Sequence, residues 1–490
     1  MSVTLHHMDA TTDRVTGRDP SRSLGEKCAV FGVYAPGLEA ARLVHTGLWT
    51  LQHRGQESTG ISVSDGVSIL THKGQGLVAH VYDEATLRPL VGHVAIGHNR
   101  YSTSRGGDGL SHAQPVTNGA QRLALAHNGN LPSTARLSQA LSDAGVDISG
   151  ANDSELMYAA LDRAMALGAS VEDAVRDCFP LFTGAFSLAL LTPNALVALR
   201  DVRGIRPLAL GRVGNGYVVS SESCAIDAIG GTFLRDVRPG EMVVMDESGL
   251  RSIQIAPGRE RLDIFEFVYF ARPDSILLGR RVNEVRRQFG ALLAREHPVQ
   301  ADVVIPVPDS GIPAAIGYAG EIGIPFDFGL LKNRYIHRTF IRPAQSLRES
   351  GVQMKLNPIA EVIRGRRIAV VDDSVVRGTT SRQIVKMLRG AGASEVHYLV
   401  SSPPVMFPDV YGIDLPNSAD LVAARMSVEQ IRESIGADSI SYLSYDGMIA
   451  ATGLPAHDFT TSCFSGVYPI SPVDGTVVDE VRETVPAQLR

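Results

Sequence analysis

Short runs in which apolar and polar residues alternate dominate the first half of the chain, from Cys28 to about residue 258. Examples are HVAIGH (93–98), RLALAH (122–127) and GYVVSS (216–221), and glycine and asparagine residues close such runs. A period of two predicts strands of an antiparallel sheet. A helical period interrupts the strands at residues 154–167, where leucines and alanines fall on one face. This half therefore has an α+β pattern.

The pattern changes after about residue 260 to an apolar strand, a polar turn and a helix. It occurs at residues 302–320 and again at 367–388, and a further apolar strand begins at residue 395. Strands that alternate with helices predict βαβ units and a parallel sheet. We therefore expect an α/β domain to follow the α+β one.

One uncharged stretch, residues 178–199, has the length of a membrane-spanning helix. Gly184 and the pair Pro193-Asn194 divide it into two pieces of strand length, which predicts a buried hairpin instead. The first 27 residues lack the apolar core of a secretory signal, and TTDRVTGRDPSRS (11–23) is typical of a disordered leader. We expect a cytoplasmic protein without membrane contact.

Length and composition add three limits to this picture. A chain of 490 residues is long enough for about two to four domains. Its 46 basic and 52 acidic side chains give a net charge of −6, so nothing indicates a nucleic-acid-binding surface. The four cysteines (Cys28, Cys178, Cys224 and Cys463) lie far apart without a CxxC pair, so neither a disulfide framework nor a zinc site is indicated.

The strand at 368–371 runs into Asp372 and Asp373, and Gly-Thr-Thr-Ser (378–381) follows at the start of a helix. Ligands bind at the carboxyl ends of parallel strands, and such a turn offers backbone N–H groups and hydroxyls to a phosphate. Two acids would repel that phosphate, so ribose hydroxyls or a shared Mg²⁺ suit them better. The alternative is that one Asp caps the helix. No Walker or GxGxxG frame is present, which disfavours ATP and NAD.

This stretch resembles the phosphoribosyl diphosphate (PRPP) signature of type I phosphoribosyltransferases, and VPDSG (307–311) resembles their pyrophosphate loop. The resemblance implies one Mg²⁺ per subunit at Ser310, Asp372 and Asp373, and a phosphate cradle from Arg377 onwards. The implied PRPP-binding residues are Ser310, Asp372, Asp373, Ser374, Arg377, Gly378, Thr379, Thr380 and Ser381. Residues 332–358 are basic and turn-rich and resemble the flap of that family, although a solvated loop would look alike.

Cys28 lies in LGEKCAVFGVY (24–34), and taken alone it is more typical of a buried core residue than of a nucleophile. Four polar stretches later in the half interrupt otherwise apolar elements. They are LQHRGQESTG (51–60), GHNRYSTSR (97–105), AHNGNL (126–131) and NDSEL (152–156). Together with Cys28, and in this order, they resemble the glutaminase domain of class II amidotransferases, whose nucleophile is an N-terminal cysteine in an αββα sandwich.

The resemblance assigns roles to seven residues. Cys28 attacks the glutamine amide, and the Asn128 side chain and Gly129 N–H stabilise the oxyanion. Arg100 and Asp153 hold the α-carboxylate and α-ammonium of glutamine, and Tyr101 and Thr103 shape the loop. Each has an alternative: Asp153 as a helix cap, Asn128-Gly129 as a hairpin turn, and Arg100 in a surface ion pair. Because the α-amine of Cys28 must serve as the base, we expect cleavage after Lys27.

From Cys28 to about residue 470 the chain is similar to the amidophosphoribosyltransferase family. That similarity implies a leader (1–27), a glutaminase domain (28–258), a phosphoribosyltransferase domain (259–470) and a tail (471–490). It implies the first committed step of purine biosynthesis, in which ammonia from glutamine displaces diphosphate from PRPP. It further implies an ammonia channel, a homo-oligomer, most often a tetramer, and inhibition by AMP and GMP.

Two alternatives and one departure from the family remain. A glutaminase with another acceptor is disfavoured by residues 369–381, and a PRPP-binding regulatory protein with an inactive glutaminase domain is disfavoured by Arg100, Asn128 and Asp153. One branch of the family holds a [4Fe–4S] cluster on four cysteines. The corresponding positions here are Asp263, Asp409, Thr460 and Cys463. With one thiol among four positions, we predict no cluster and an ordinary thiol at Cys463. For Cys178 and Cys224 we predict packing roles.

Overall fold

The computed structural model describes residues 28–101, 110, 112–333, 356–412 and 417–478. The leader, Thr103, most of the expected flap and the end of the tail therefore lie outside the described residues. The boundaries of the four expected segments stay predictions. None of the described helices is long and apolar enough to span a membrane.

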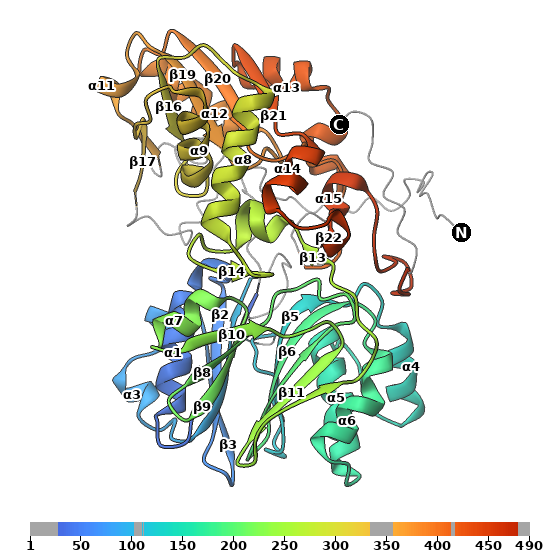
Figure 1. The fold of residues 1–490 in the computed structure, drawn as a ribbon. Coiled ribbons are helices and arrows are strands. Elements are labelled where there is room, and N and C mark those ends of the chain that lie inside the picture. The colour runs from blue at the N-terminus through green and yellow to red at the C-terminus, as the bar shows by residue number, and fades with distance from the viewer. Residues whose placement is uncertain (1–27, 102–109, 111, 334–355, 413–416, 479–490) are drawn as a thin grey trace.

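The first half contains two antiparallel sheets that face each other, with helices on both outer sides (Figure 1). The seven-stranded sheet has the order β10-β8-β9-β1-β4-β2-β3, and the five-stranded sheet has the order β12-β11-β7-β6-β5. Their strands are β1 (Ala29–Tyr34), β2 (Ser58–Ser64), β3 (Ile69–Gln75), β4 (Val94–Arg100), β5 (Ala124–Asn130), β6 (Ala185–Leu191), β7 (Leu196–Arg200), β8 (Ala209–Val213), β9 (Gly216–Ser220), β10 (Thr232–Asp236), β11 (Glu241–Asp246) and β12 (Gly249–Gln254).

Helices cover the outer face of each sheet. The helices of this half are α1 (Ala40–Thr50), α2 (Val78–Val81), α3 (Glu84–Leu87), α4 (Ala135–Asp143), α5 (Asp153–Ala166), α6 (Val171–Cys178) and α7 (Ser223–Ala228). Helices α1 and α7 pack on the seven-stranded sheet, and α4, α5 and α6 cover the five-stranded one. This is the αββα sandwich that the sequence predicts.

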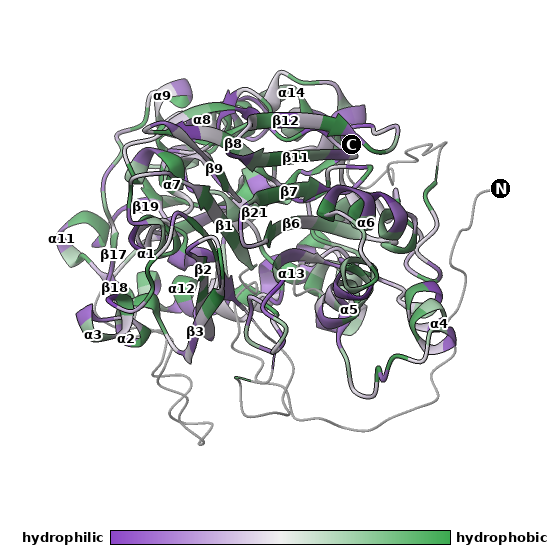
Figure 2. Ribbon diagram, turned by 90° about the horizontal axis from the view of Figure 1, so that it is seen from below, coloured by the Kyte–Doolittle hydropathy of each residue, from purple (hydrophilic) through white to green (hydrophobic). Residues whose placement is uncertain are grey.

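Strand β1 shows why the sandwich has a core on both sides of each sheet. Phe31 and Val33 pack with α1, whereas Val30 and Tyr34 point to the space between the sheets. Both faces are buried, so the strand is apolar throughout. In Figure 2 the strands between the helical layers are mainly green, whereas α5 and α6 carry purple stretches.

The expected hairpin at residues 178–199 is confirmed. β6 and β7 pair antiparallel, with Leu191 opposite Leu196, and residues 192–195 form the turn between them. All residues of both strands are buried. The stretch is uncharged because it lies in the middle of the five-stranded sheet.

The second half is built on a parallel sheet with the order β16-β19-β20-β21, which confirms the expected α/β domain. Its strands are β16 (Val303–Pro306), β19 (Arg367–Asp372), β20 (Glu395–Val400) and β21 (Ser439–Tyr442). Shorter pairs surround it: β13 (Leu262–Asp263) with β22 (Phe459–Thr460), β14 (Ile276–Leu277) with β15 (Arg280–Arg281), and β17 (Leu330–Lys332) with β18 (Leu356–Pro358).

Helices lie on both faces of this sheet (Figure 1). They are α8 (Val282–Glu296), α9 (Ile312–Ile322), α11 (Ala360–Ile363), α12 (Thr379–Gly390), α13 (Val428–Ile435), α14 (Tyr445–Thr452) and α15 (Ser462–Ser465). One face, with Val304, Ala369 and Leu399, packs against α8, α9 and α14, and the other packs against α12 and α13. A π-helical turn, Glu266–Phe270, lies between the two halves.

Close packing of α8 on α9 depends on glycine. A Cβ added at Gly290 would lie 1.8 Å from the carbonyl oxygen of Ala314, and one at Gly317 would lie 1.9 Å from that of Arg287. Backbone atoms cannot rotate away as side chains do, so the helices would have to separate. The two glycines therefore set the distance between α8 and α9.

We expect Gly290→Ala to lower the free energy of unfolding by about 2–3 kcal/mol, because overpacking strains the α8–α9 contact. Gly320→Ala is the matched control, since Gly320 is exposed on α9 and its Cβ would contact nothing within 4 Å. That variant gains helix propensity and is expected to be neutral or slightly stabilising. Urea unfolding of both variants measures the difference, and equal stabilities would contradict this account of the packing.

Candidate active sites

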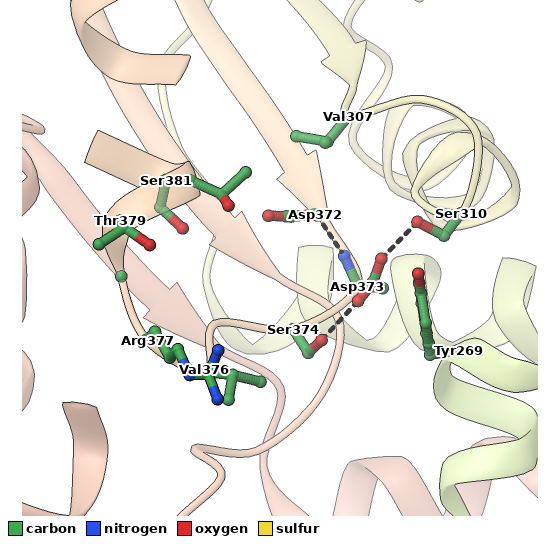
Figure 3. A pocket seen from close by; sticks show the side chains of 12 residues that line it. Tyr269, Val307, Ser310, Asp372, Asp373, Ser374, Val376, Arg377, Thr379 and Ser381 are labelled. Atoms are coloured by element: carbon green, nitrogen blue, oxygen red, sulfur yellow. Dashed lines mark hydrogen bonds between the residues drawn. The ribbon is translucent and has the colours of Figure 1, made fainter. Parts of the chain in front are cut away.

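The carboxyl ends of β16 and β19 open into a cavity of about 150 Å³ (Figure 3). All nine residues expected to bind PRPP line it, from Ser310 to Ser381. They come from the loop after β16, from the end of β19 and from the first turn of α12. The strand, acid pair and Gly-Thr-Thr-Ser turn are therefore assembled at one edge of the sheet, where ligands bind in such folds.

Asp372 and Asp373 form a buried pair of acids at the end of β19. The Tyr398 hydroxyl donates a hydrogen bond to Asp372, and the hydroxyls of Ser310 and Ser374 donate to the two oxygens of Asp373. Burial and the neighbouring charge of Asp373 raise the pKa of Asp372 to about 8. Burial also raises the pKa of Asp373, against the effect of its hydrogen bonds and Arg286.

This donor set suits a hard divalent cation. Mg²⁺ prefers oxygen ligands and is usually held by one or two carboxylates together with substrate phosphates. A cation beside the pair would offset the mutual repulsion that raises the pKa of Asp372. Among the described residues, no group of three or more His, Cys, Asp and Glu side chains is arranged to hold a metal ion. The acid pair and the Ser310 hydroxyl are oxygen donors of the kind that Mg²⁺ prefers, and substrate phosphates are the usual source of further ligands.

The phosphate turn begins at Gly378, which has a φ of +74° and directly precedes α12. This left-handed conformation favours glycine. Neither Asp372 nor Asp373 caps the helix, so the interpretation of either as a helix cap is wrong. Helix α12 has twelve residues, and Thr379, Thr380 and Ser381 of its first turn line the cavity, so that a helix N-terminus lies at the cavity, as in many phosphate sites.

The two ends of the expected flap are described and its middle is not. β17 and β18 pair antiparallel, with Lys332 opposite Leu356. Lys332 Nζ lies 2.8 Å from Asp309 Oδ2, in the loop that carries Ser310. Residues 334–355 lie outside the described residues, so the role of the flap stays a prediction.

Cys28 directly precedes β1, and β1 pairs with β4 so that Ala29 lies opposite Asn99. This register places Cys28 beside Arg100 and Tyr101, and its thiol donates to the Tyr101 carbonyl at 3.9 Å. The side chain is half-buried. Burial raises the pKa of the Cys28 thiol, with Asp153 and Glu57 adding to the effect and Arg100 opposing it. The thiol is thus protonated at neutral pH and needs a base before it can attack.

Asn128 and Gly129 lie within β5, opposite Ser187 and Phe186 of β6. The hairpin-turn interpretation of this dipeptide is therefore wrong. Gly129 has a φ of +154°, and a Cβ there would lie 2.0 Å from the carbonyl oxygen of Ala185. The Asn128 side chain is buried, with Nδ2 3.5 Å from Ser221 Oγ.

Asp153 is the first residue of α5 rather than its cap. The neighbouring Asn152 caps the helix by accepting from the backbone N–H of Glu155, so the cap interpretation of Asp153 is wrong. Oδ2 of Asp153 accepts from Leu131 N at 3.2 Å, and the same oxygen lies 3.8 Å from His127 Nδ1. Asp153 and Arg100 both act on the charge state of Cys28, which places the two expected glutamine-binding groups near the nucleophile.

Strand β5 meets the second half of the chain at residues 410–412. Asn130 donates from Nδ2 to the carbonyl of Val410 at 2.8 Å. A Cβ added at Gly412 would lie 3.5 Å from the backbone of Gly129. The strand that carries Asn128 and Gly129 is therefore in direct contact with the second half.

Two protein-family models match the chain. A glutamine amidotransferase domain matches residues 98–228, and a phosphoribosyl transferase domain matches residues 282–402. The amidophosphoribosyltransferase of Mycobacterium tuberculosis is 47% identical over 94% of this chain and 92% of its own length. That of Bacillus subtilis is 43% identical over 95% and 98%. The chain belongs to the amidophosphoribosyltransferase family.

A solved structure supports the same assignment. The glutamine PRPP amidotransferase of B. subtilis, complexed with ADP and GMP, is 42% identical, matches with a TM-score of 0.85, and covers 92% of this chain and 99% of its own. The fold class and the activity expected from the sequence are confirmed. Members of this family transfer the amide nitrogen of glutamine to PRPP, forming 5-phosphoribosylamine, glutamate and diphosphate in purine biosynthesis, and this chain does the same. These relatives do not support the regulatory-protein alternative.

Several residues around the amidophosphoribosyltransferase sites were not expected from the sequence. Tyr269 lines the PRPP cavity, Gln114 accepts from His127 N at 2.6 Å, and Ser221 contacts Asn128. None of the three lies in a stretch that the sequence pattern assigns to a site. Ser221 ends the strand-like run GYVVSS (216–221), and Gln114 lies between two predicted strands, without a local signal of function.

The four positions that correspond to cluster ligands in one branch of the family are all buried. Asp263 lies opposite Thr460 in the β13–β22 pair, and Asp409 accepts from the Ser462 hydroxyl at 3.3 Å. Burial and Glu266 raise the pKa of Asp263 to about 7 against the effect of Arg206. Burial, Asp263 and Asp409 raise the pKa of Cys463. That no cluster binds here stays a prediction; Cys463, Cys178 and Cys224 each lie in a hydrophobic cluster.

Proposed function

We propose that glutamine is hydrolysed at Cys28 and that the released ammonia is used at the cavity lined by Asp372 and Asp373. The observation that carries this proposal is the convergence of Cys28, Arg100 and Asp153, which lie far apart in the sequence. The α-amine of Cys28, freed by cleavage after Lys27, takes the thiol proton. The thiolate then attacks the amide carbon.

In the first half-reaction the negative charge on the amide oxygen is stabilised by Asn128 Nδ2 and the Gly129 N–H. Arg100 pairs with the α-carboxylate of glutamine and Asp153 accepts from its α-ammonium, while Tyr101 and Thr103 shape the loop. Ammonia leaves, and water hydrolyses the thioester to glutamate. Ammonia then has to pass from the first half to the second, which an internal channel between the two sites would provide; the close approach of Gly412 to Gly129 shows that the two halves meet beside the oxyanion donors.

In the second half-reaction ammonia attacks C1 of PRPP and diphosphate departs. Ser310, Asp372 and Asp373 would hold one Mg²⁺, which when bound supplies positive charge to the leaving diphosphate. Ser374 and the turn Arg377, Gly378, Thr379, Thr380 and Ser381 bind the phosphate of the ribose. Tight positioning matters because C1 develops oxocarbenium character as the bond to diphosphate breaks.

Regulation and assembly are further parts of this proposal. A B. subtilis relative is described as complexed with ADP and GMP, and another matched structure as an allosteric regulatory enzyme of purine biosynthesis. We infer that purine nucleotides such as AMP and GMP inhibit this enzyme and that it forms a homotetramer. A cytoplasmic location stays a prediction.

Asp153→Asn is expected to raise the KM for glutamine by about tenfold to a hundredfold, since a hydrogen bond to a charged group contributes about 1.5–3 kcal/mol. Synthesis from ammonium chloride should be unchanged. The matched control is Asn152→Ala, which removes the α5 cap and costs about 1 kcal/mol of stability without touching glutamine. Equal KM values in the two variants would show that Asp153 does not bind glutamine.

Cleavage after Lys27 is tested by intact mass and N-terminal sequencing of the purified enzyme. We expect a chain that begins at Cys28. An active enzyme that starts at Met1 or Ser2 would contradict the role of the Cys28 α-amine as the base, because that nitrogen would be an amide.

A further inference from the structure

Three consecutive buried residues, Ser220, Ser221 and Glu222, connect β9 to α7. Ser221 contacts both parts of the glutaminase site. Its Oγ accepts from Val30 N at 2.9 Å, and Val30 is the second residue after Cys28. The same oxygen lies 3.5 Å from Asn128 Nδ2, and the Ser221 N–H donates to the Val30 carbonyl at 2.9 Å.

The amide of Asn128 has two hydrogens on Nδ2. If one points at the oxyanion of the reacting glutamine, the other is available to Ser221 Oγ. An acceptor at this point fixes the rotation of the amide, so that its remaining N–H stays aimed at the substrate. Preorganisation of this kind is what gives an oxyanion donor its catalytic effect.

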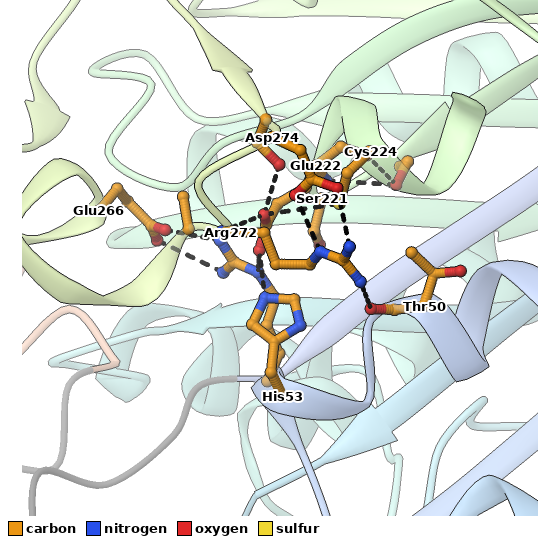
Figure 4. A network of polar contacts seen from close by, with 12 residues as sticks. Thr50, His53, Ser221, Glu222, Cys224, Glu266, Arg272 and Asp274 are labelled. Carbon is orange, nitrogen blue, oxygen red and sulfur yellow. Dashed lines mark hydrogen bonds and ion pairs between the residues drawn. The ribbon is translucent and has the colours of Figure 1, made fainter. Parts of the chain in front are cut away.

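Glu222, the next residue, is fully buried and binds groups on both halves of the chain (Figure 4). Its carboxylate accepts from Arg54 Nε and from His53 Nε2 in the first half. It also accepts from Arg272 N at 2.8 Å and from the Ser275 hydroxyl at 2.6 Å in the second half. Arg54 in turn pairs with Glu266 of the π-helical turn.

The segment that carries Glu266, Arg272 and Ser275 is itself fixed to the PRPP side. Arg286 of α8 is buried and donates to the carbonyls of Phe267 and Ala271, at 2.7 and 2.8 Å. Its guanidinium also acts electrostatically on Asp373. Hydrogen bonds therefore link α8 of the second half, through residues 267–275, to Glu222, the neighbour of Ser221.

We propose that Ser221 is a positioning residue for Asn128, and that Glu222 holds Ser221 in place against residues 266–275 of the second half. The oxyanion site then has its working geometry only when the two halves are docked through this turn. The inference rests on the proposed roles of Cys28 and Asn128. A purely structural role of the turn is the competing explanation, and it predicts a loss of stability without a change in turnover.

The first test is Ser221→Ala, assayed for glutamine hydrolysis and for synthesis from ammonium chloride. We expect kcat for glutamine hydrolysis to fall about tenfold, a fraction of the roughly 10²–10³-fold cost of losing an oxyanion donor itself. The KM for glutamine should change less than twofold and ammonia-dependent synthesis should not change. A kcat for glutamine within twofold of wild type would overturn the proposal.

Ser64→Ala is the matched control. Ser64 is equally buried, donates to the Pro193 carbonyl and accepts from Gly66 N, and lies at the end of β2 remote from Arg100. We expect Ser64→Ala to lower the free energy of unfolding about as much as Ser221→Ala does and to leave kcat for glutamine hydrolysis unchanged. A double-mutant cycle separates positioning from packing. Adding Ser221→Ala to Asn128→Ala should cost no further activity, whereas a further tenfold loss would overturn the assignment to Asn128.

The second test comes from the other half of the chain. Ser275→Ala removes one hydrogen bond to Glu222 and leaves its ion pair with Arg54 intact, so the variant should fold. We expect a fall of about threefold in kcat for glutamine hydrolysis, since one hydrogen bond to a carboxylate is lost. Ser465→Ala, a buried serine bonded to Thr461, is the control. Equal kcat values in the two variants would overturn the link to the second half.

Cys28→Ala separates failure of this inference from failure of the proposed function. If Cys28→Ala abolishes glutamine hydrolysis and Ser221→Ala leaves it unchanged, only the positioning role is wrong. If Cys28→Ala retains full glutamine hydrolysis, the proposed site is wrong, and the positioning role falls with it.

Discussion

Cys28→Ala is expected to lower glutamine-dependent synthesis of phosphoribosylamine by at least about 10⁴-fold, the scale seen when a covalent nucleophile is removed. Alanine provides no thiolate, and the oxyanion donors Asn128 and Gly129 then have no tetrahedral intermediate to stabilise. Synthesis from ammonium chloride should stay within twofold of wild type, because PRPP binds in the other half. Parallel assays with the two nitrogen sources measure the difference.

Cys178→Ala is the control for the loss of a thiol. Cys178 is buried in the hydrophobic cluster around α5 and α6, so its replacement should cost stability and leave both activities in the folded enzyme unchanged. If Cys28→Ala also lost ammonia-dependent synthesis, damage to the fold would explain the result better than loss of the nucleophile. If it kept glutamine-dependent synthesis, Cys28 would be a packing residue.

The PRPP cavity could be predicted from the sequence because most of it is contiguous. Asp372 to Ser381 follow one another through a strand end, a turn and the start of α12. In a parallel sheet this local order fixes where the residues lie. Of the nine expected residues, only Ser310 comes from elsewhere in the chain, from the loop after the neighbouring strand β16. Tyr269 was missed because it reaches the cavity from the π-helical turn at the junction, which no pattern of period two or 3.6 indicates.

The alternatives considered for the glutaminase half failed for two different reasons. Asn128-Gly129 has the composition of a hairpin turn, but pairing with β6 places it within a strand, so tertiary structure overrides a local preference. The cap of α5 is Asn152, one residue before Asp153, because helix boundaries are hard to place to within one residue from the sequence.

Ser221 and Glu222 could not be found from the sequence. Ser221 meets Val30 across 191 positions, and Glu222 meets Arg54 across 168. Strand pairing in the seven-stranded sheet brings β9 beside β1, and the register of that pair decides which residue faces the site. A single sequence carries no signal for such contacts.

Asp373→Asn is expected to lower synthesis about 10³-fold with glutamine and with ammonia alike. The change removes one charge from the acid pair, and loss of cation-assisted stabilisation of the leaving diphosphate is worth several kcal/mol, at about 1.4 kcal/mol for each factor of ten. Glutamine hydrolysis measured without PRPP should remain within a few-fold of wild type. A titration with MgCl₂ at fixed PRPP is expected to show a higher half-saturating concentration, because one carboxylate ligand is missing.

Asp302→Asn is the matched control, since Asp302 lies just before β16 at the opposite edge of the same sheet and pairs with Arg367. It should change neither the rate of synthesis nor the Mg²⁺ requirement. The interaction between the two acids also explains why Asp373→Asn should lower the rate of synthesis. With one charge gone, burial still raises the pKa of Asp372, but repulsion by Asp373 no longer adds to it. Asp372 therefore ionises more readily and still cannot replace the lost ligand. A variant that kept wild-type synthesis and Mg²⁺ dependence would show that the cation is held elsewhere, by groups that the strand end of β19 does not supply.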